Sequence, residues 1–242
     1  MNKLYKKSEL AFSIISIVIY VITLSLADNI SKTLGVEKLI TAIISAVLTI
    51  IFVIWMKKNE LFHKYGLCKS EMSASQLLYY IPLVIIISVN LWFGVRLNYS
   101  ITETIFFVIS MVFVGFLEEI IFRGFLFTAM SKDNVKIAIL VSSVTFGMGH
   151  IVNLINGSGA NVFSNLLQVV YATAVGFLFT IIFYKSKSLW PCIITHSLVN
   201  ALSAISNNGI LNSSVEIIIT LIWSFISIFY AIYIIKIEDV EY

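Results

Sequence analysis

Apolar residues gather in eight long runs along this chain, and short polar segments separate the runs. Isoleucine, leucine, valine and phenylalanine dominate runs that cover about 10–27, 39–56, 77–95, 101–122, 136–153, 162–184, 189–206 and 215–235. A helix needs about 20 apolar residues to cross a bilayer, and each run approaches that length. Segments of alternating polarity, which are typical of membrane β-barrels, are missing. The pattern predicts an all-α polytopic membrane protein with about eight transmembrane helices.

The runs follow one another without a break that would separate domains. The fourth run keeps a helical pattern as far as Met130, and no internal repeat is visible. We therefore expect a single membrane domain over residues 1–242. The first run follows three lysines but is long and lacks a clear cleavage site, so we expect it to be a retained span rather than a signal peptide.

Composition excludes several classes of protein. Hydrophobic residues make up 59% of the chain, charged residues make up 12%, and the mean hydropathy is +0.98. Soluble domains carry roughly 25% charged residues, so a water-soluble enzyme, a disordered chain and a nucleic-acid-binding domain are all excluded. The two cysteines, Cys68 and Cys192, lie far apart and form neither a disulfide framework nor a zinc-ribbon spacing.

The basic residues predict the orientation in the membrane. Thirteen of the sixteen lie before the first span, in alternate connections or after the last span, and only Lys32, Lys38 and Arg96 fall on the other side. The positive-inside rule then places both termini in the cytoplasm. This topology explains the basic residues without a nucleic-acid partner. A composition rich in isoleucine, lysine and asparagine is typical of AT-rich bacteria, so we expect a bacterial cell membrane.

A few ionisable residues fall inside the spans, where they are costly and functional by default. Eleven of the thirteen acidic residues lie in loops or at span ends, which leaves Glu118 and Glu119. In the sequence EEIIFR, Glu119 and Arg123 are four residues apart and suited to an ion pair on one helix face. Glu118 is turned by about 100° from Glu119. One carboxylate can therefore pair with Arg123 while the other faces a cavity.

Two of the three histidines also lie within spans. In FGMGH, Phe146 and His150 share a helix face, and we expect Gly147 and Gly149 to let neighbouring helices approach closely. In HSLVN, His196 and Asn200 lie one turn apart.

The residue types indicate hydrolysis by an activated water. A carboxylate in a partly desolvated pocket can act as a general base, and an asparagine can donate a hydrogen bond to an oxyanion. Ser197 adjoins His196 but points about 100° away from it, so a serine nucleophile is not indicated. Water activated by Glu118 is the simplest nucleophile.

The three motifs, EEIIFR (118–123), FGMGH (146–150) and HSLVN (196–200), resemble those of the CPBP family of intramembrane proteases, EExxxR, FxxxH and HxxxN/D. This family, also called ABI, includes CAAX prenyl proteases and proteins of bacteriocin processing and immunity. The motif-bearing core spans about residues 75–210.

This resemblance implies helices around a catalytic cavity open to the cytoplasm. It makes Glu118 the base with His150 beside it, and it makes His196 and Asn200 the pair that stabilises the oxyanion. Glu119, Arg123 and Phe146 become supporting residues. Glu118, His150 and His196 would suit a zinc ion with an open position, and they would equally suit a metal-free water.

The leading hypothesis is an intramembrane endopeptidase that cuts a membrane-associated peptide or a prenylated CAAX-type protein. A second hypothesis is a bacteriocin self-immunity protein of the same fold that binds without hydrolysis. A third is a proton-coupled transporter, against which stands the lack of an inverted repeat.

Overall fold

The structure, a computed structural model, describes residues 1–156, 161–207 and 212–237. These residues form helices and connecting turns, and no β-strand lies among them. The helices are α1 (Asn2–Lys7), α2 (Glu9–Thr33), α3 (Leu39–Lys58), η1 (Leu78–Tyr80), α4 (Ile81–Ser88), η2 (Val89–Leu91), α5 (Ile101–Glu118), η3 (Glu119–Phe127), α6 (Thr128–Met130), α7 (Val135–Gly149), η4 (His150–Leu154), α8 (Val162–Ser186), α9 (Trp190–Leu202), η5 (Ser203–Ile205) and α10 (Ser213–Lys236).

All eight predicted runs are helical, which confirms an all-α polytopic membrane protein. Within the described ranges, six helices are long and apolar enough to cross a membrane, and one of them runs without a break from Ile101 to Met130. The runs predicted at 77–95 and 189–206 form the shorter apolar helices Leu78–Leu91 and Trp190–Ile205. Large apolar side chains such as Ile19 and Ile22 of α2 are about half exposed on the outside of the bundle, where lipid would cover them.

Polar side chains define where several helices begin. Ser8, Asn134 and Asn212 each accept a hydrogen bond from a backbone N–H in the first turn of α2, α7 and α10. Ser100 and Glu103 form a reciprocal capping box at the start of α5. Both prolines of the chain lie in the first turn of the short helices α4 and α9, where no intrahelical N–H is needed.

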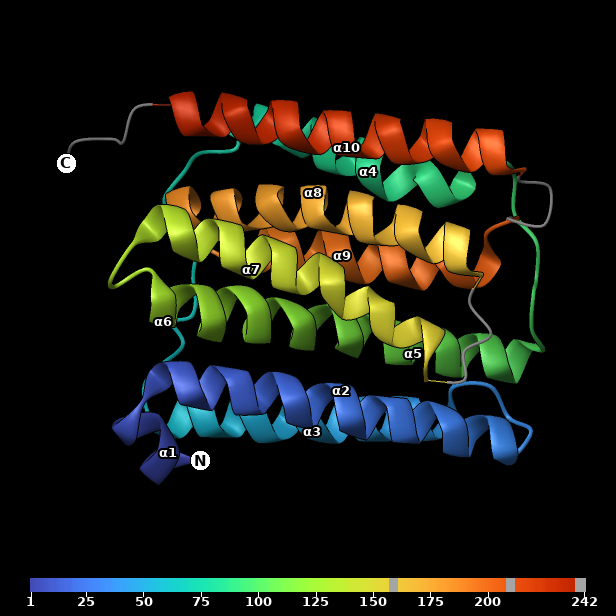
Figure 1. The fold of residues 1–242 in the computed structure, drawn as a ribbon, viewed down its shortest axis with the longest axis horizontal. Helices are drawn as coiled ribbons and strands as arrows, with labels where there is room; N and C mark the ends of the chain where they lie inside the picture. Colours follow the sequence, from blue (N-terminus) through green and yellow to red (C-terminus); the bar gives the residue numbers. More distant parts are fainter. Residues whose placement is uncertain (157–160, 208–211, 238–242) are drawn as a thin grey trace.

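The helices pack as a bundle in which the long segment of α5, η3 and α6 lies near the middle (Figure 1). The α2–α3 hairpin packs on one side of this segment, through α3 against α5 and α2 against η3. On the other side α7 packs on α8 and α5 packs on α9, while α10 and α4 form the outer layer against α8 and α9. The chain start and the end of α10 lie at the same end of the bundle.

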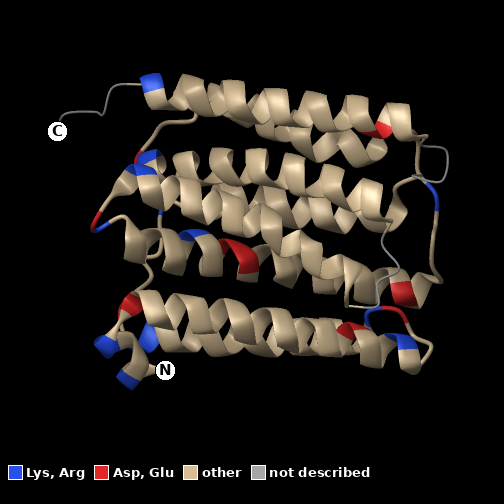
Figure 2. Cartoon of the chain, in the orientation of Figure 1, with Lys and Arg blue, Asp and Glu red and all other residues tan. Residues whose placement is uncertain are grey.

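Charged residues mark the two ends of this bundle (Figure 2). Most lysines gather at the end that holds α1, the α3–α4 connection and the turn between α8 and α9. The turn between α2 and α3, next to Lys32 and Lys38, and the connection before α5, which contains Arg96, lie at the opposite end. Among the described residues, charge enters the middle of the bundle in the segment from α5 to α6, which contains Glu118, Glu119 and Arg123. The predicted segregation of basic residues is therefore present in the folded chain.

Candidate active site

A stretch of π-helix carries the first motif. Residues Glu119–Phe127 form this wider turn directly after α5, and all nine side chains are buried. The Ser142 hydroxyl of α7 donates a hydrogen bond of 2.9 Å to the Phe122 carbonyl oxygen inside the stretch. Such π-helical turns are rare and are frequent at functional sites. Here the π-helical stretch begins at Glu119, directly after Glu118, and the side chains of these two residues point in different directions.

Glu119 lies at the centre of a buried polar cluster. Its Oε1 accepts a hydrogen bond of 3.1 Å from Arg123 Nη1 and lies 2.8 Å from His196 Nδ1. Glu119 and Arg123 are both fully buried, and His196 is nearly so. The ion pair expected from the spacing of Glu119 and Arg123 is present, and it also fixes the imidazole from the third motif.

Aromatic rings enclose the Arg123 guanidinium. Its central carbon lies 4.1 Å from the ring centroid of Phe146 and 5.7 Å from that of Phe179. A Cβ added at Gly176 would lie 3.1 Å from Arg123 Nη2, so α8 leaves room for the guanidinium at this glycine. The aromatic residue of the second motif therefore supports the arginine of the first by a cation–π contact.

Glu118 faces the other way and lines a cavity of about 510 Å³. Its Oε1 accepts a hydrogen bond of 2.6 Å from the Tyr20 hydroxyl of α2. Its Oε2 lies 3.4 Å from His196 Nε2. The two glutamates therefore take the two positions expected from the sequence. Glu119 pairs with Arg123, and Glu118 faces the cavity.

His150 and Asn200 also line this cavity. The His150 ring packs edge-on against Phe146 with 5.5 Å between centroids, and Asn165 donates a hydrogen bond of 2.9 Å to the His150 carbonyl. The structure therefore brings together side chains from all three motifs. The geometry differs in one respect from the expected pairing of His196 with Asn200, because both ring nitrogens of His196 face carboxylates.

The charges of the cluster indicate how its protons are placed. A carboxylate only accepts hydrogen bonds, so the contact between His196 Nδ1 and Glu119 requires a proton on Nδ1. In a neutral His196 the lone pair of Nε2 would then face the Glu118 carboxylate. Two carboxylates and one guanidinium leave one negative charge, and a proton shared between His196 and Glu118 would neutralise it. A buried cluster of this kind is favoured when its charges balance.

The two glycines of the second motif have different surroundings. A Cβ at Gly147 would collide with the Thr173 hydroxyl and lie 2.9 Å from the Thr173 backbone nitrogen of α8. No atom lies within 4 Å of a Cβ built at Gly149, which instead lines the cavity. The expected close approach of a neighbouring helix therefore holds at Gly147 and is wrong at Gly149.

The residues expected to suit zinc are not grouped as a metal site. In the part of the chain that the structure describes, no three His, Cys, Asp or Glu side chains are grouped so that they could hold a metal ion. His196 Nδ1 faces the Glu119 carboxylate, and His196 Nε2 lies 3.4 Å from Glu118 Oε2. No step below uses a metal.

The cavity extends from Glu118 toward the turn between α2 and α3. Ser25 and Asp28 of α2 and Lys38 and Thr41 around the turn line it at that end. This end of the bundle lies opposite the lysine clusters (Figure 2). Two expectations from the sequence therefore exclude one another: a cavity facing the cytoplasm, and lysine clusters facing the cytoplasm.

Sequence reasoning missed Tyr20. It is a buried residue in an apolar run, and no motif or charge distinguishes it from the other tyrosines of the chain. The Tyr20 hydroxyl is a polar group within the apolar helix α2, and this is the one local signal that it offers. The signal does not tell which helix the hydroxyl faces. Asp28 and Lys38 likewise lie at span ends, where charged residues are common and indicate no site.

Comparison with known proteins agrees with the site. Residues 100–202, which contain all three motifs, match the family model described as Type II CAAX prenyl endopeptidase Rce1-like. A protein of Bacillus subtilis (strain 168) with the name "Putative membrane peptidase YdiL" is 33% identical over 94 residues. That match covers 38% of this chain and only 33% of the relative's length. No solved structure matches the chain. On the motifs, the fold and this match together, residues 100–202 are similar to the Rce1-like CAAX prenyl endopeptidases.

Proposed function

We propose that this protein is an intramembrane endopeptidase in which Glu118 activates the water that attacks a peptide bond. The observation that carries the proposal is the position of Glu118 in the wall of a 510 Å³ cavity, with His150 and Asn200 in the same wall. The match of residues 100–202 to the Rce1-like family model and the name of the Bacillus relative support the same class of reaction. The substrate is a membrane-associated peptide or a lipidated protein.

The reaction follows from the residues around Glu118. Its carboxylate takes a proton from water as the water oxygen attacks the carbonyl carbon of the substrate. The carbonyl oxygen then carries a negative charge, which His150 and Asn200 can stabilise from the cavity wall. When the carbon–nitrogen bond breaks, the proton passes from Glu118 to the leaving amine. Tyr20 holds one oxygen of Glu118, which leaves the other for the water.

Glu119 and Arg123 act indirectly in this scheme, through His196. Neither residue lines the cavity, but the Glu119 carboxylate, which pairs with Arg123, accepts a hydrogen bond from His196 Nδ1. His196 then presents Nε2 to Glu118 and can exchange a proton with it. We assign His196 to proton placement at Glu118 rather than to the oxyanion.

The test is cleavage by the purified protein in detergent or proteoliposomes, with a library of quenched fluorogenic peptides as the probe. Glu118→Gln should lower the rate by roughly 10²–10⁴-fold, the usual contribution of a general base. The control is Glu103→Gln, which alters a surface helix cap and should leave the rate within about twofold. Full activity of the Glu118→Gln variant would refute the proposal. A peptide that binds equally to both proteins and is cut by neither would instead favour the non-catalytic immunity function.

A further inference from the structure

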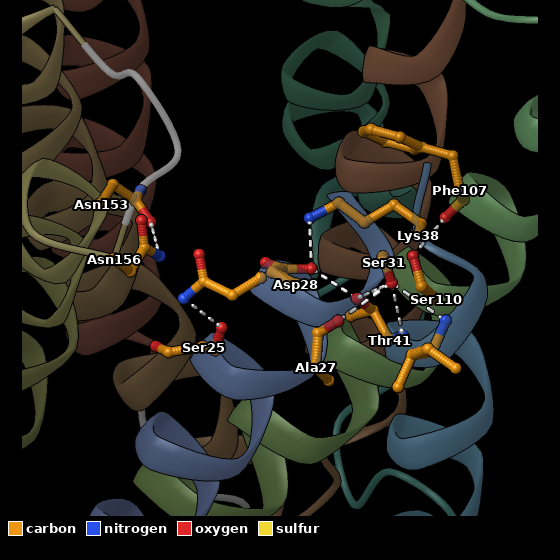
Figure 3. A network of polar contacts seen from close by, with 12 residues as sticks. Ser25, Ala27, Asp28, Ser31, Lys38, Thr41, Phe107, Ser110, Asn153 and Asn156 are labelled. Atoms are coloured by element: carbon orange, nitrogen blue, oxygen red, sulfur yellow. Dashed lines mark hydrogen bonds and ion pairs between the residues drawn. The ribbon is translucent and has the colours of Figure 1, made fainter. Parts of the chain in front are cut away.

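Beyond the catalytic residues, the cavity has a polar end that no motif accounts for. From Glu118 it runs past Met111 and Val114 of α5 and, on α2, from Tyr20 to Asp28. Eight residues of helix correspond to about 12 Å. The polar end of the cavity consists of Ser25, Asp28, Lys38, Thr41, Asn153 and Asn156 (Figure 3).

This polar end is held in place by a network of contacts. The Lys38 ammonium lies 2.8 Å from Asp28 Oδ1, and the Thr41 hydroxyl donates a hydrogen bond to the same oxygen. Lys38 adopts a left-handed backbone conformation with φ of 58° directly before α3, which is uncommon for a residue with a side chain. Ser31 accepts a hydrogen bond of 3.0 Å from the Ile40 N–H and so fastens α3 to α2. The two helices therefore hold Asp28 and Lys38 at fixed positions on the cavity wall.

The opposite direction, from Glu118 toward the lysine clusters, is filled by packed aromatic side chains. Phe125 of the π-helix contacts Phe12, Phe52, Trp55 and Tyr65, with ring centroids 4.9 to 6.0 Å apart. All five side chains are buried. Among the described residues, the lining of the cavity includes none from 57–76, 131–134 or 185–189. A substrate thus has a route to Glu118 from the end with Asp28. A separate pocket of about 660 Å³ lies at the other end, between Cys68 and Trp190, and Glu118 does not line it.

The lining of the cavity indicates what occupies it. Amide side chains reach it from four elements: Asn90 from η2, Asn153 from η4, Gln168 from α8 and Asn200 from α9. Asn153 donates a hydrogen bond of 3.3 Å to Gln168, which is a long bond that a better partner can replace. A peptide backbone needs a donor and an acceptor at every residue when it leaves water. A polyisoprenyl or acyl chain has no such groups and could pack only against the apolar part of the lining, which includes Val21, Leu24 and Val114.

We infer that a peptide substrate reaches Glu118 from the extracytoplasmic side, through the polar end of the cavity beside Asp28 and Lys38. The side follows from the lysine clusters, which lie at the other end of the bundle and which the positive-inside rule assigns to the cytoplasm (Figure 2). The nature of the occupant rests on the proposed peptidase function, whereas the direction of entry rests on geometry and charge alone. The substrate is then a secreted or outer-leaflet peptide.

Cysteine accessibility in intact cells tests the direction of entry. Cys68, in the connection between α3 and α4, is the natural reporter of the lysine-rich end, and Cys192 is fully buried. The second reporter is Ser25→Cys in a Cys68→Ser chain, because Ser25 lines the polar end and the substitution hardly changes its size. Burial and the nearby Glu71 carboxylate raise the pKa of the Cys68 thiol. Labelling is therefore carried out at about pH 8.5, where thiolate forms more readily.

With a membrane-impermeant methanethiosulfonate, we expect Ser25→Cys to be modified in intact cells and Cys68 only after the membrane is permeabilised. The reverse pattern would overturn the inference. So would a Ser25→Cys thiol that reacts in detergent but not from outside the cell. The same labelling repeated in a Glu118→Gln chain needs no catalysis, so it decides the route even if the proposed activity fails.

A second readout links the route to the substrate. Complete modification of Ser25→Cys in purified protein should lower cleavage of a quenched fluorogenic peptide by more than about tenfold, because the bulky adduct fills the polar end. Modification of Cys68 serves as the control and should leave cleavage unchanged. Unchanged cleavage after complete modification of Ser25→Cys would show that peptides enter elsewhere. If the unmodified protein cuts no peptide, the proposed function fails while the labelling result stands.

Discussion

Tyr20 donates a hydrogen bond of 2.6 Å to Glu118, and it does so from α2, a helix outside the segment that matches the family model. The first span of the chain therefore supplies a contact to the glutamate that we propose as the general base. Because the hydroxyl occupies Oε1, the carboxylate is held in one rotamer with Oε2 near His196. We treat Tyr20 as a positioning residue.

Tyr20→Phe should lower kcat and leave KM nearly unchanged. A hydrogen bond to a charged group contributes about 1.5–3 kcal/mol, so a rate loss of roughly 10- to 100-fold is expected if the bond is kept in the transition state. Steady-state kinetics on a cleaved fluorogenic peptide measure both constants. Tyr230→Phe is the matched control, because it removes a buried hydroxyl that donates to the Leu77 carbonyl far from Glu118. Equal losses in both variants would assign Tyr20 to folding alone.

The Glu119–Arg123 pair leads to a prediction about stability. Glu119→Gln leaves a fully buried guanidinium without its counter-charge and offers only a neutral amide oxygen to Arg123 Nη1 and His196 Nδ1. Breaking a buried pair in this way costs about 3–5 kcal/mol, which lowers the thermal midpoint on the order of 10 °C. Intrinsic fluorescence in detergent monitors the transition.

The double variant Glu119→Leu/Arg123→Met separates stability from activity at this pair. It replaces the ion pair by apolar side chains, and such replacements are often neutral or stabilising. We expect it to recover most of the lost thermal midpoint. It should stay inactive, because His196 no longer has the carboxylate that orients it. An active double variant would mean that His196 does not need Glu119.

Metal removal distinguishes the two mechanisms that the motifs leave open. The described His, Cys, Asp and Glu side chains do not assemble a three-ligand group. We therefore expect cleavage to survive prolonged treatment with a strong chelator, and elemental analysis of active protein to give well under one zinc per chain. Loss of activity on chelation, with recovery on adding zinc alone, would favour the metallopeptidase form of the site.

The sequence predicted the fold well because membrane burial acts on every residue of a span. A run such as 162–184 has to be helical in lipid, since its backbone hydrogen bonds have no other partner. It also predicted the partition between Glu118 and Glu119, because residues next to each other on a helix point about 100° apart. These features depend only on residues close together in the chain.

Contacts between distant residues could not be predicted in this way. Tyr20 lies 98 positions from Glu118, and no spacing rule links α2 to α5. The π-helical stretch Glu119–Phe127 also has no local signal, because its residues are equally compatible with an α-helix. Ser142, which donates a hydrogen bond to the Phe122 carbonyl inside the stretch, comes from a different helix. The direction in which the cavity opens depends on how helices far apart in the sequence, from α2 to α10, pack around it. The family resemblance implies an opening to the cytoplasm, which stays a prediction beside the entry route inferred above.

The two glycines of the second motif allow a matched comparison of packing and access. Alanine at Gly147 would place a Cβ against Thr173, 2.9 Å from its backbone nitrogen, so α7 and α8 would have to separate. Overpacking of this kind costs about 1–3 kcal/mol. Alanine at Gly149 meets no atom within 4 Å and should gain up to about 1 kcal/mol from the lower backbone entropy of the unfolded chain.

The two variants should therefore respond differently in stability and in activity. Gly147→Ala should lower the thermal midpoint, and activity should fall in proportion to the folded fraction. Gly149→Ala should fold at least as well as the native chain but cleave more slowly, because its methyl group enters the cavity beside His150. Thermal unfolding and steady-state cleavage on the same preparations measure both effects. A stable Gly149→Ala variant with undiminished cleavage would mean that substrate does not occupy this part of the cavity.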